Sequence, residues 1–413
     1  MNIKGFFALT VSLLCFCVAC SGGEPEGDNN GMNLELSTKS MEYIKKGESF
    51  AYDFLDRINS YSKEDYVISP LSMQFLLGLL LDGAADGTAD EISKVLGYGA
   101  GETEEVNKYC LEMLSQLPKL DKKTTVTIAN ALMVNKQYPL LDSYIKSVQN
   151  YYEAEVNNLD FSDSEAAARK INKWCADHTN DMIKKIIDAE DVGPDLVTVL
   201  LNALYFKGEW TEKFSKEYTE KEDFTTTSGN TVKVDMMKVL REYRYGESDT
   251  FESVTLPYGN ESYSMTVILP KDGKKISDVT AALKTKGFYQ SLYGGGTTKL
   301  DVDLWLPKFE TKFHVDLNDI LSAMGMPSAF GGRADFSAMS KYALCLSFVR
   351  QDAAIRVDES GSEAAAISSA GMKLTALPEM KTVTFHADRP FLYLIMENST
   401  GTVLFAGRFG AGS

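Results

Sequence analysis

The spacing of apolar positions divides the chain into an early part with helical periodicity and a later part with strand-like alternation. Residues 49–58 place four large apolar side chains on one helical face. Residues 73–81 are almost wholly apolar, which predicts a buried helix that ends at Asp82 and Gly83. Further helical patterns cover residues 89–96, 104–117, 141–151 and 165–187.

Strand-like patterns follow these helices and interrupt them once. Two runs of mostly apolar residues, 124–133 and 197–206, predict buried strands. Alternating or β-branched runs predict further strands at residues 231–239, 252–256, 263–269, 300–306 and 383–386. Because most helices come early and most strands come late, the pattern indicates an α+β domain with large, largely antiparallel sheets.

One segment stands apart in composition. Between an alternating run at 344–357 and a strand-like block at 391–396, residues 358–371 have an acidic start and then small side chains at nearly every position. Small side chains bury too little apolar surface to offset the lost chain entropy, so the composition predicts an exposed loop. A loop of this kind can also slide between two existing strands as a new central strand.

The first residues read as a targeting segment. Lys4 precedes an apolar run that is too short to span a bilayer as a helix, so residues 1–19 predict a secretory signal. The run ends at Cys20, and its surroundings resemble the site at which bacterial lipoproteins are cleaved and lipidated. We therefore expect lipidation at Cys20, with a plain secretory signal cut near Ala19 as the alternative.

Composition bounds the rest of the chain. Residues 20–40 are expected to form a disordered tether, because the stretch after Cys20 is polar, glycine-rich and acidic. Residues 41–413 are expected to form one folded domain. The chain of 413 residues has a net charge of −16, which argues against nucleic acid as a partner. The expected location is the outer membrane or surface of a Gram-negative-type bacterium, with the lipid as the chain's one membrane contact.

Residues that could support catalysis are few. His178, His314 and His386 are the three histidines, and none lies in a recognisable nucleophile, zinc or phosphate-binding motif. Beyond the signal and Cys20, the cysteines Cys110, Cys175 and Cys345 are odd in number and widely spaced, which predicts free thiols. The sequence gives no positive argument for an enzyme, a metal site or a cofactor.

An ordered set of motifs resembles the serpins over residues 41–409. The motifs are Ile68-Ser69-Pro70-Leu71-Ser72, Gly83-Ala84, Gly87-Thr88, residues 201–210, Met236-Met237, 256–258, 268–270, Leu306-Pro307-Lys308-Phe309, 334–337, the loop at 359–369, 388–391 and 404–407. The resemblance implies a fold of three sheets and about nine helices with an exposed reactive-centre loop. It also implies a monomeric suicide inhibitor that traps a serine protease as an acyl-enzyme while the loop inserts into the main sheet.

The resemblance assigns roles along the loop. Its hinge comprises Glu359, Gly361, Ser362, Glu363, Ala364, Ala365 and Ala366. On insertion the row Ser362, Ala364, Ala366 and Ser368 would face the core, where uniformly small side chains suit rapid entry. The row that begins with Glu363 would face outward.

Two further groups match family roles. Trp210, Lys308 and Glu359 correspond to the breach, where the loop first enters the sheet, and a Lys308–Glu359 pair would hold the hinge out until cleavage. Ser69, Ser72 and Asn202 match the shutter, the polar cluster beneath the sheet. Gln351 stands where the family usually has histidine and Asp65 where it usually has asparagine, so the local hydrogen bonds must be rearranged.

Counting along the loop places the scissile bond at Thr375–Ala376, which implies an elastase-like target, such as a protease released by a host. A shorter register makes Lys373 the residue before the cut and implies a trypsin-like target, whereas Leu374 or Met372 would suit a chymotrypsin-like enzyme. Two alternatives stay open: a serpin used for binding without inhibition, and an inhibitor of papain-like cysteine proteases.

Overall fold

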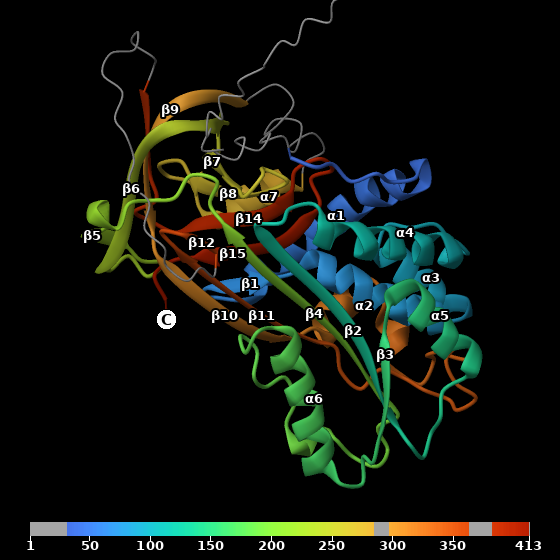
Figure 1. The fold of residues 1–413 in the computed structure, drawn as a ribbon. Helices are drawn as coiled ribbons and strands as arrows, with labels where there is room; N and C mark the ends of the chain where they lie inside the picture. Colours follow the sequence, from blue (N-terminus) through green and yellow to red (C-terminus); the bar gives the residue numbers. More distant parts are fainter. Residues whose placement is uncertain (1–30, 285–296, 363–381, 413) are drawn as a thin grey trace, which may run out of the picture.

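The computed structural model describes residues 31–284, 297–362 and 382–412, in which helices pack against two hydrogen-bonded sheets (Figure 1). The described ranges contain eight α-helices: α1 (Thr38–Tyr61), α2 (Pro70–Gly83), α3 (Asp86–Val95), α4 (Thr103–Gln116), α5 (Asp142–Tyr152), α6 (Ser164–His178), α7 (Ile276–Leu283) and α9 (Asn318–Met324). The α+β class predicted from the pattern is confirmed.

The six-stranded sheet has the order β10-β11-β12-β4-β2-β3. Its strands are β2 (Thr124–Asn135), β3 (Glu155–Leu159), β4 (Thr198–Glu209), β10 (Phe309–Asp316), β11 (Arg350–Asp358) and the two-residue β12 (Gly361–Ser362). Of its pairs only β2 with β3 is parallel. β12 therefore lies between two much longer strands: β11, which directly precedes it in the chain, and β4, which comes from a distant part.

The nine-stranded sheet has the order β1-β15-β14-β8-β7-β6-β9-β13, with β5 paired to β6. Its strands are β1 (Tyr66–Ile68), β5 (Glu220–Thr225), β6 (Thr231–Glu247), β7 (Phe251–Tyr258), β8 (Tyr263–Pro270), β9 (Thr297–Pro307), β13 (Thr382–His386), β14 (Phe391–Glu397) and β15 (Val403–Phe409). Only residues 244–247 of β6 pair with β7, so the network consists of two parts joined at one corner. With the six-stranded sheet, these two parts give the expected three-sheet arrangement.

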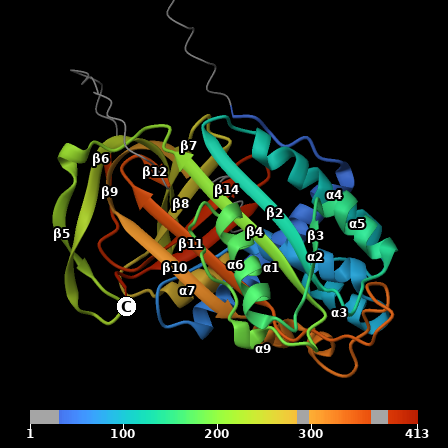
Figure 2. The same ribbon diagram turned by 60° about the horizontal axis from the view of Figure 1, so that its bottom comes forward.

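Helices α2 and α6 cover opposite faces of the six-stranded sheet, and α6 crosses in front of β4 in Figure 2. α2 begins at Pro70 after Ser69, whose hydroxyl caps the helix by accepting a hydrogen bond from the Ser72 backbone N–H. Nearly every residue of α2 is buried, as its apolar sequence predicts. Opposite it, Val199, Leu201 and Ala203 of β4 pack in a second core against α6.

The prediction of one helix over 165–187 was wrong in its second half. α6 ends at His178, because Asn180 and Asp181 adopt left-handed backbone conformations that break the helix. The Thr179 hydroxyl also donates to the Cys175 carbonyl oxygen at 2.7 Å and satisfies one of the last helical carbonyls. Residues 179–191 instead form a loop beside α6, which we call the covering loop.

The expected strand at 344–349 was also wrong, since β11 begins only at Arg350. Its neighbour β10 ends at Asp316, so the segment has no strand beside it on that side. The Asn318 side chain takes the place of a strand there, because it accepts from the Val349 N–H at 2.8 Å and donates to the Ser347 carbonyl at 3.0 Å.

The domain boundary expected at Met41 was placed too late. α1 begins at Thr38, where Ser37 caps it by accepting from the Ser40 N–H at 3.1 Å. Leu34 is buried, and the Met32 N–H donates to the Ser262 hydroxyl at 2.8 Å. Residues 31–40 therefore belong to the folded domain, while residues 1–30, with Cys20, lie outside the described residues.

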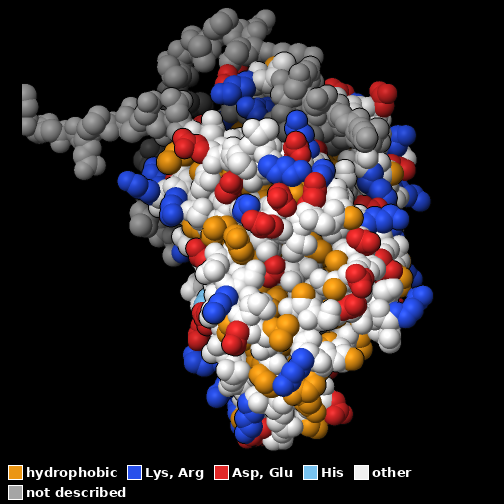
Figure 3. Space-filling view, turned by 90° about the vertical axis from the view of Figure 1, so that its right-hand side faces the viewer, with side chains coloured by type: hydrophobic (Ala, Val, Ile, Leu, Met, Phe, Trp, Pro, Cys, Tyr) orange, Lys and Arg blue, Asp and Glu red, His pale blue; other side chains and the backbone are white. Residues whose placement is uncertain are grey.

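The surface shows both signs of charge. On the face of α3, α4 and α5, acidic and basic side chains are interspersed with small apolar patches (Figure 3). Within the described residues, no helix has the length and apolar character needed to cross a membrane.

A chain shortened to begin at Met41 is expected to be less stable than one that begins at Gly31. The shortening removes the Ser37 cap and the buried Leu34 side chain, which together contribute about 2–4 kcal/mol to the free energy of unfolding. Urea unfolding of both chains measures the difference. Equal midpoints would show that residues 31–40 add no stability.

Candidate functional site

The site is centred on β12, which pairs antiparallel with a long strand on each side. Ser362 lies opposite Gly208 of β4 and Val357 of β11. In the described residues, β4 pairs with β2 along one edge. Along its other edge β4 pairs only with Gly361 and Ser362 of β12. We call the space between the facing edges of β4 and β11 the slot. Its upper end is occupied by the start of the small-residue segment.

Gly361 is required where it stands. Its backbone has φ of +151°, in a region that L side chains rarely adopt. A Cβ atom at this position would also collide with the Gly208 carbonyl oxygen across the strand pair. Gly361, which the resemblance assigns to the hinge, thus occupies a position that a residue with a Cβ atom could take only with strain.

Ser362 turns its side chain toward the core. It is 1% exposed, and its hydroxyl lies 2.6 Å from the hydroxyl of Tyr258. The Trp210 ring stacks on the Tyr258 ring at a centroid distance of 4.4 Å and closes this corner of the sheet. The core-facing position predicted for Ser362 is thus found in the structure.

Trp210, Lys308 and Glu359 meet at the same corner, as the resemblance implies. Lys308 Nζ lies 2.9 Å from Glu359 Oε2, and the buried carboxylate also accepts from the Thr219 hydroxyl at 2.9 Å. Trp210 Nε1 donates to the Asp358 carbonyl at 2.9 Å, and its backbone N–H donates to the Ser360 carbonyl. Side chains from three separate segments therefore fix residues 358–360 just before the slot.

The ion pair sets the charge of Glu359. Burial raises the pKa of this carboxyl, but hydrogen bonds from Lys308, the backbone and Thr219 more than offset that effect. The pKa therefore lies below its ordinary value of 4.5. The carboxylate is charged at neutral pH and forms a charge-assisted pair with Lys308.

The predicted shutter residues form one connected polar cluster beneath the slot. The Gln351 side chain accepts from the Ser69 N–H at 3.1 Å and donates to the Ser69 carbonyl at 2.8 Å. Ser72 donates to the Asn202 amide oxygen, and Asn202 donates to Asn130 at 2.7 Å. Gln351, which stands where the family usually has histidine, thus forms two hydrogen bonds with the backbone of Ser69.

Asp65 lies elsewhere. Its two carboxylate oxygens accept from the backbone N–H groups of Gly410 and Gly412 at 2.6 and 2.8 Å. The substitution at Asp65 therefore rearranges hydrogen bonds at the end of β15 and not in the polar cluster.

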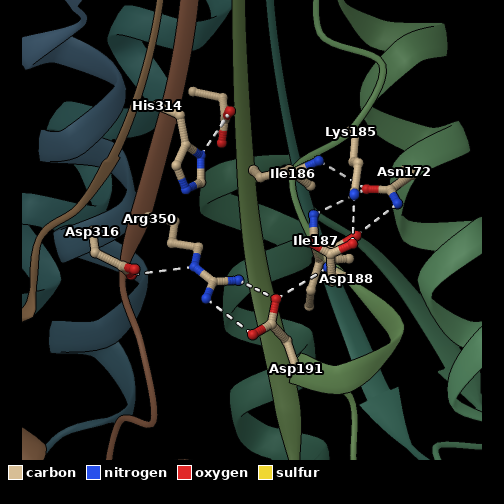
Figure 4. A network of polar contacts seen from close by, with 10 residues as sticks. Asn172, Lys185, Ile186, Ile187, Asp188, Asp191, His314, Asp316 and Arg350 are labelled. Atoms are coloured by element: carbon tan, nitrogen blue, oxygen red, sulfur yellow. Dashed lines mark hydrogen bonds and ion pairs between the residues drawn. The ribbon is translucent and has the colours of Figure 1, made fainter.

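A polar network ties the covering loop to the sheet (Figure 4). Arg350 of β11 donates two hydrogen bonds to Asp191, at 2.5 and 3.0 Å, and a third to Asp316 at 3.2 Å. Asn172 of α6 binds the backbone of Ile186 and Ile187. Contacts at residues 186–187 and at Asp191 therefore hold the covering loop over the half of the slot that lies away from β12.

Several functional contacts were not predicted. Tyr258 lies in a motif that was recognised without a role, and Asn130 gave no signal beyond its place in a buried strand. Thr219 and the Arg350–Asp191 pair join residues far apart in the sequence, so no local pattern marks them. The predicted residues Glu363, Ala364, Ala365, Ala366, Met372, Lys373, Leu374, Thr375 and Ala376 lie outside the described residues.

The histidines form no catalytic arrangement in the described residues. His314 pairs with Asp352, His386 with Asp303, and His178 with Glu155 and the Trp174 carbonyl. No serine or cysteine hydrogen-bonds any of them in those residues. The same ranges hold no group of three or more residues able to bind a metal ion.

Comparisons with known proteins agree with this geometry. Residues 45–410 match the family model described as Serpin (serine protease inhibitor). An uncharacterized serpin-like protein of Methanosarcina acetivorans is 32% identical, over 99% of this chain and 98% of its own length. Serpin B3 of Homo sapiens is 31% identical, over 88% of this chain and 97% of its own length.

Two solved structures are also similar. The native state of the thermophilic serpin tengpin superposes with a TM-score of 0.82 at 27% identity, over 92% of this chain and 97% of its own. Human thyroxine-binding globulin in complex with its hormone gives a TM-score of 0.82 at 28% identity, over 91% of this chain and 100% of its own.

Glu359→Gln is expected to lower the free energy of unfolding by about 1–3 kcal/mol at pH 7, because it removes the charge that pairs with Lys308. Since the pKa of Glu359 is depressed, its contribution is present above the ordinary value of 4.5 and is lost as the pH falls through the folded-state value. The difference between the two proteins should therefore shrink in acid.

Thermal unfolding at pH 7 and below pH 4 measures this effect. Glu310→Gln is the matched control, because Glu310 pairs with Lys312 on the exposed side of β10, where ion pairs contribute little. An equal loss in both variants, or a loss that does not depend on pH, would contradict the assigned role of the Glu359–Lys308 pair.

Proposed function

The chain belongs to the serpin family, and we propose that it is a suicide inhibitor of serine proteases with Thr375–Ala376 as the reactive bond. The observation that carries this proposal is β12. Two residues of the small-residue segment already pair as a strand with both β4 and β11. A sheet that accepts these residues in antiparallel register can accept those that follow in the same register.

The trapping step follows from this arrangement. The protease serine attacks the Thr375 carbonyl, the bond to Ala376 breaks, and the enzyme remains bound to Thr375 as an ester. The freed segment can then enter the slot, and a dozen new ladder hydrogen bonds at about 1 kcal/mol each favour entry by on the order of 10 kcal/mol. Insertion draws the bound protease along the sheet before water can release it.

The composition of the loop supports an inhibitor over a binding protein. The core-facing row Ser362, Ala364, Ala366 and Ser368 contains no charge, proline or large side chain that would stop entry. Thr375 before the cut suits a shallow, apolar specificity pocket, so the proposed target is elastase-like. Trypsin-like, chymotrypsin-like and papain-like targets, and binding without inhibition, are outcomes of the test.

The test mixes the purified chain, from residue 31 on, separately with elastase, trypsin, chymotrypsin and a papain-like protease. A covalent complex that survives denaturing electrophoresis with elastase, and a released peptide beginning at Ala376, are expected. Ala364→Arg should turn the inhibitor into a substrate, because a charge in the core-facing row blocks insertion. Ala364→Ser, the matched control, should keep the complex. Cleavage by all four enzymes without any complex would refute inhibition.

We further propose that Cys20 carries the lipid that tethers the domain to a membrane. The support is the short apolar run of residues 1–19 and the small residues around Cys20. Expressed in a Gram-negative host, the full chain is expected in the membrane fraction, with a diacylglyceryl group on its first residue, Cys20. Cys20→Ser should release the protein from the membrane. An unmodified N-terminus near Cys20 in the soluble fraction would favour the plain secretory signal.

A further inference from the structure

The C-terminal end of α6 carries a histidine whose two ring nitrogens both face hydrogen-bond acceptors. His178 is the last residue of the helix, and its Nδ1 lies 2.8 Å from the Trp174 carbonyl oxygen. Its Nε2 lies 3.3 Å from Oε1 of Glu155, the first residue of β3. A carbonyl oxygen and an ionised carboxylate accept hydrogen bonds but do not donate them. Both ring nitrogens of His178 must therefore carry a proton to satisfy this arrangement.

Glu155 joins two aromatic rings of α6 to β3, which lies at the edge of the six-stranded sheet. Its second oxygen, Oε2, accepts from Trp174 Nε1 at 3.1 Å. The rings of Trp174 and His178 lie against each other, with centroids 4.3 Å apart. Trp174 itself is buried and packs in the second core with Leu159 of β3. One carboxylate on the edge strand therefore holds two side chains that lie one helical turn apart.

The surroundings of His178 favour a positive charge. The last turn of a helix carries a partial negative charge, which stabilises a cation there. Among the described residues, Glu155 is the one ion-pair partner of His178. Asp177, the adjacent carboxylate on α6, pairs with Lys173 at 2.9 Å on the exposed surface of the helix. The nearest charged residues of the covering loop line a groove beside β10 and β11 instead: Asp181, Lys184 and Lys185.

Loss of one proton turns the contact between His178 and Glu155 from attraction into repulsion. A neutral imidazole keeps one N–H, which the Trp174 carbonyl requires at Nδ1, so Nε2 then presents a lone pair. That lone pair faces the Glu155 carboxylate, and neither group can donate a hydrogen bond to the other. Because Glu155 is half-exposed, its side chain can turn into water, which also takes the acceptor away from the Trp174 indole N–H.

The other two histidines of the chain lie differently. In the described residues, His314 contacts Asp352 through Nδ1 and His386 contacts Asp303 through Nε2, so each uses one ring nitrogen. A neutral imidazole satisfies either contact, because the nitrogen that donates can keep its proton. His178 is therefore the histidine whose contacts require the charged form.

We propose that His178 and Glu155 form a pH-sensitive clamp between the end of α6 and β3. The clamp is closed while His178 carries both ring protons, and it opens as the pH rises and one proton is lost. Histidine side chains ordinarily make this change between about pH 5 and pH 8. The covering loop begins directly after His178, so the clamp sets how firmly both the helix end and the loop are held on the six-stranded sheet. This inference does not rest on the proposed function, and its test needs no protease.

The experiment measures backbone hydrogen exchange of residues 175–183 by mass spectrometry in the full chain, at about pH 5.5 and about pH 8. The natural chain is compared with Glu155→Gln at the same pH, so that the intrinsic pH dependence of exchange cancels. At the lower pH the natural chain should exchange about 3-fold more slowly, because a charged pair at a half-exposed site contributes a modest amount. At the higher pH the difference should vanish or reverse. The glutamine amide can then donate to the neutral His178 ring while its oxygen accepts from Trp174.

Glu165→Gln is the matched control, because Glu165 pairs with Arg169 on the exposed surface at the other end of α6. It should leave exchange of residues 175–183 unchanged at both pH values. A second variant, His178→Gln, removes the titrating group. In that background the effect of Glu155→Gln should be the same at both pH values, since the two residues act as one unit.

Three outcomes would overturn the clamp. The first is equal exchange of the natural chain and Glu155→Gln at the lower pH, which would show that the pair does not hold the helix end. The second is a difference of the same size at both pH values, which would show a contact without a titrating group. The third is a pH-dependent effect of Glu155→Gln that persists in the His178→Gln background, because a different group would then be the one that titrates.

Discussion

The structure depends on two long strands that are held apart at a position where a sheet would normally be continuous. β4 and β11 each have a full partner on one side, but in the described residues they are joined to each other only through Gly361 and Ser362. Backbone N–H and C=O groups along such edges favour pairing with a further strand. The other contacts of the site surround these edges.

The contacts around the slot form two groups that differ in position. The buried Glu359 carboxylate, with Lys308, Thr219 and Trp210, fixes the chain immediately before β12 and resists further movement. Beneath the slot, Gln351 and Asn202 tie β11 and β4 to the start of α2 through Ser69 and Ser72. These bonds hold β4 and β11 in place relative to α2, and each contributes a small increment of about 1 kcal/mol.

Much of this could be predicted from the sequence, because many of its signals are local. The apolar runs of α2, β2 and β4 show their burial, and the ordered motifs place Trp210, Lys308 and Glu359 at one corner before any contact is seen. The failures have physical reasons. Residues 344–349 alternate like a strand but lack the neighbouring strand that pairing requires. α6 ends before two residues, Asn180 and Asp181, that adopt left-handed conformations, and the amino-acid composition does not specify such conformations. Thr219 and Asp191 act across more than a hundred residues, which no period can reveal.

The low β-propensity of the small-residue segment is consistent with its use as a strand. Alanine, serine and glycine favour strands weakly, so the segment has little tendency to pair before a partner is available. If the segment enters the slot as proposed, its backbone gains ladders on both sides, and that gain does not depend on side-chain identity. Side chains would then decide only whether the segment fits. The proposed function therefore requires a segment whose composition predicts an exposed loop and whose first two residues, Gly361 and Ser362, already pair as a strand.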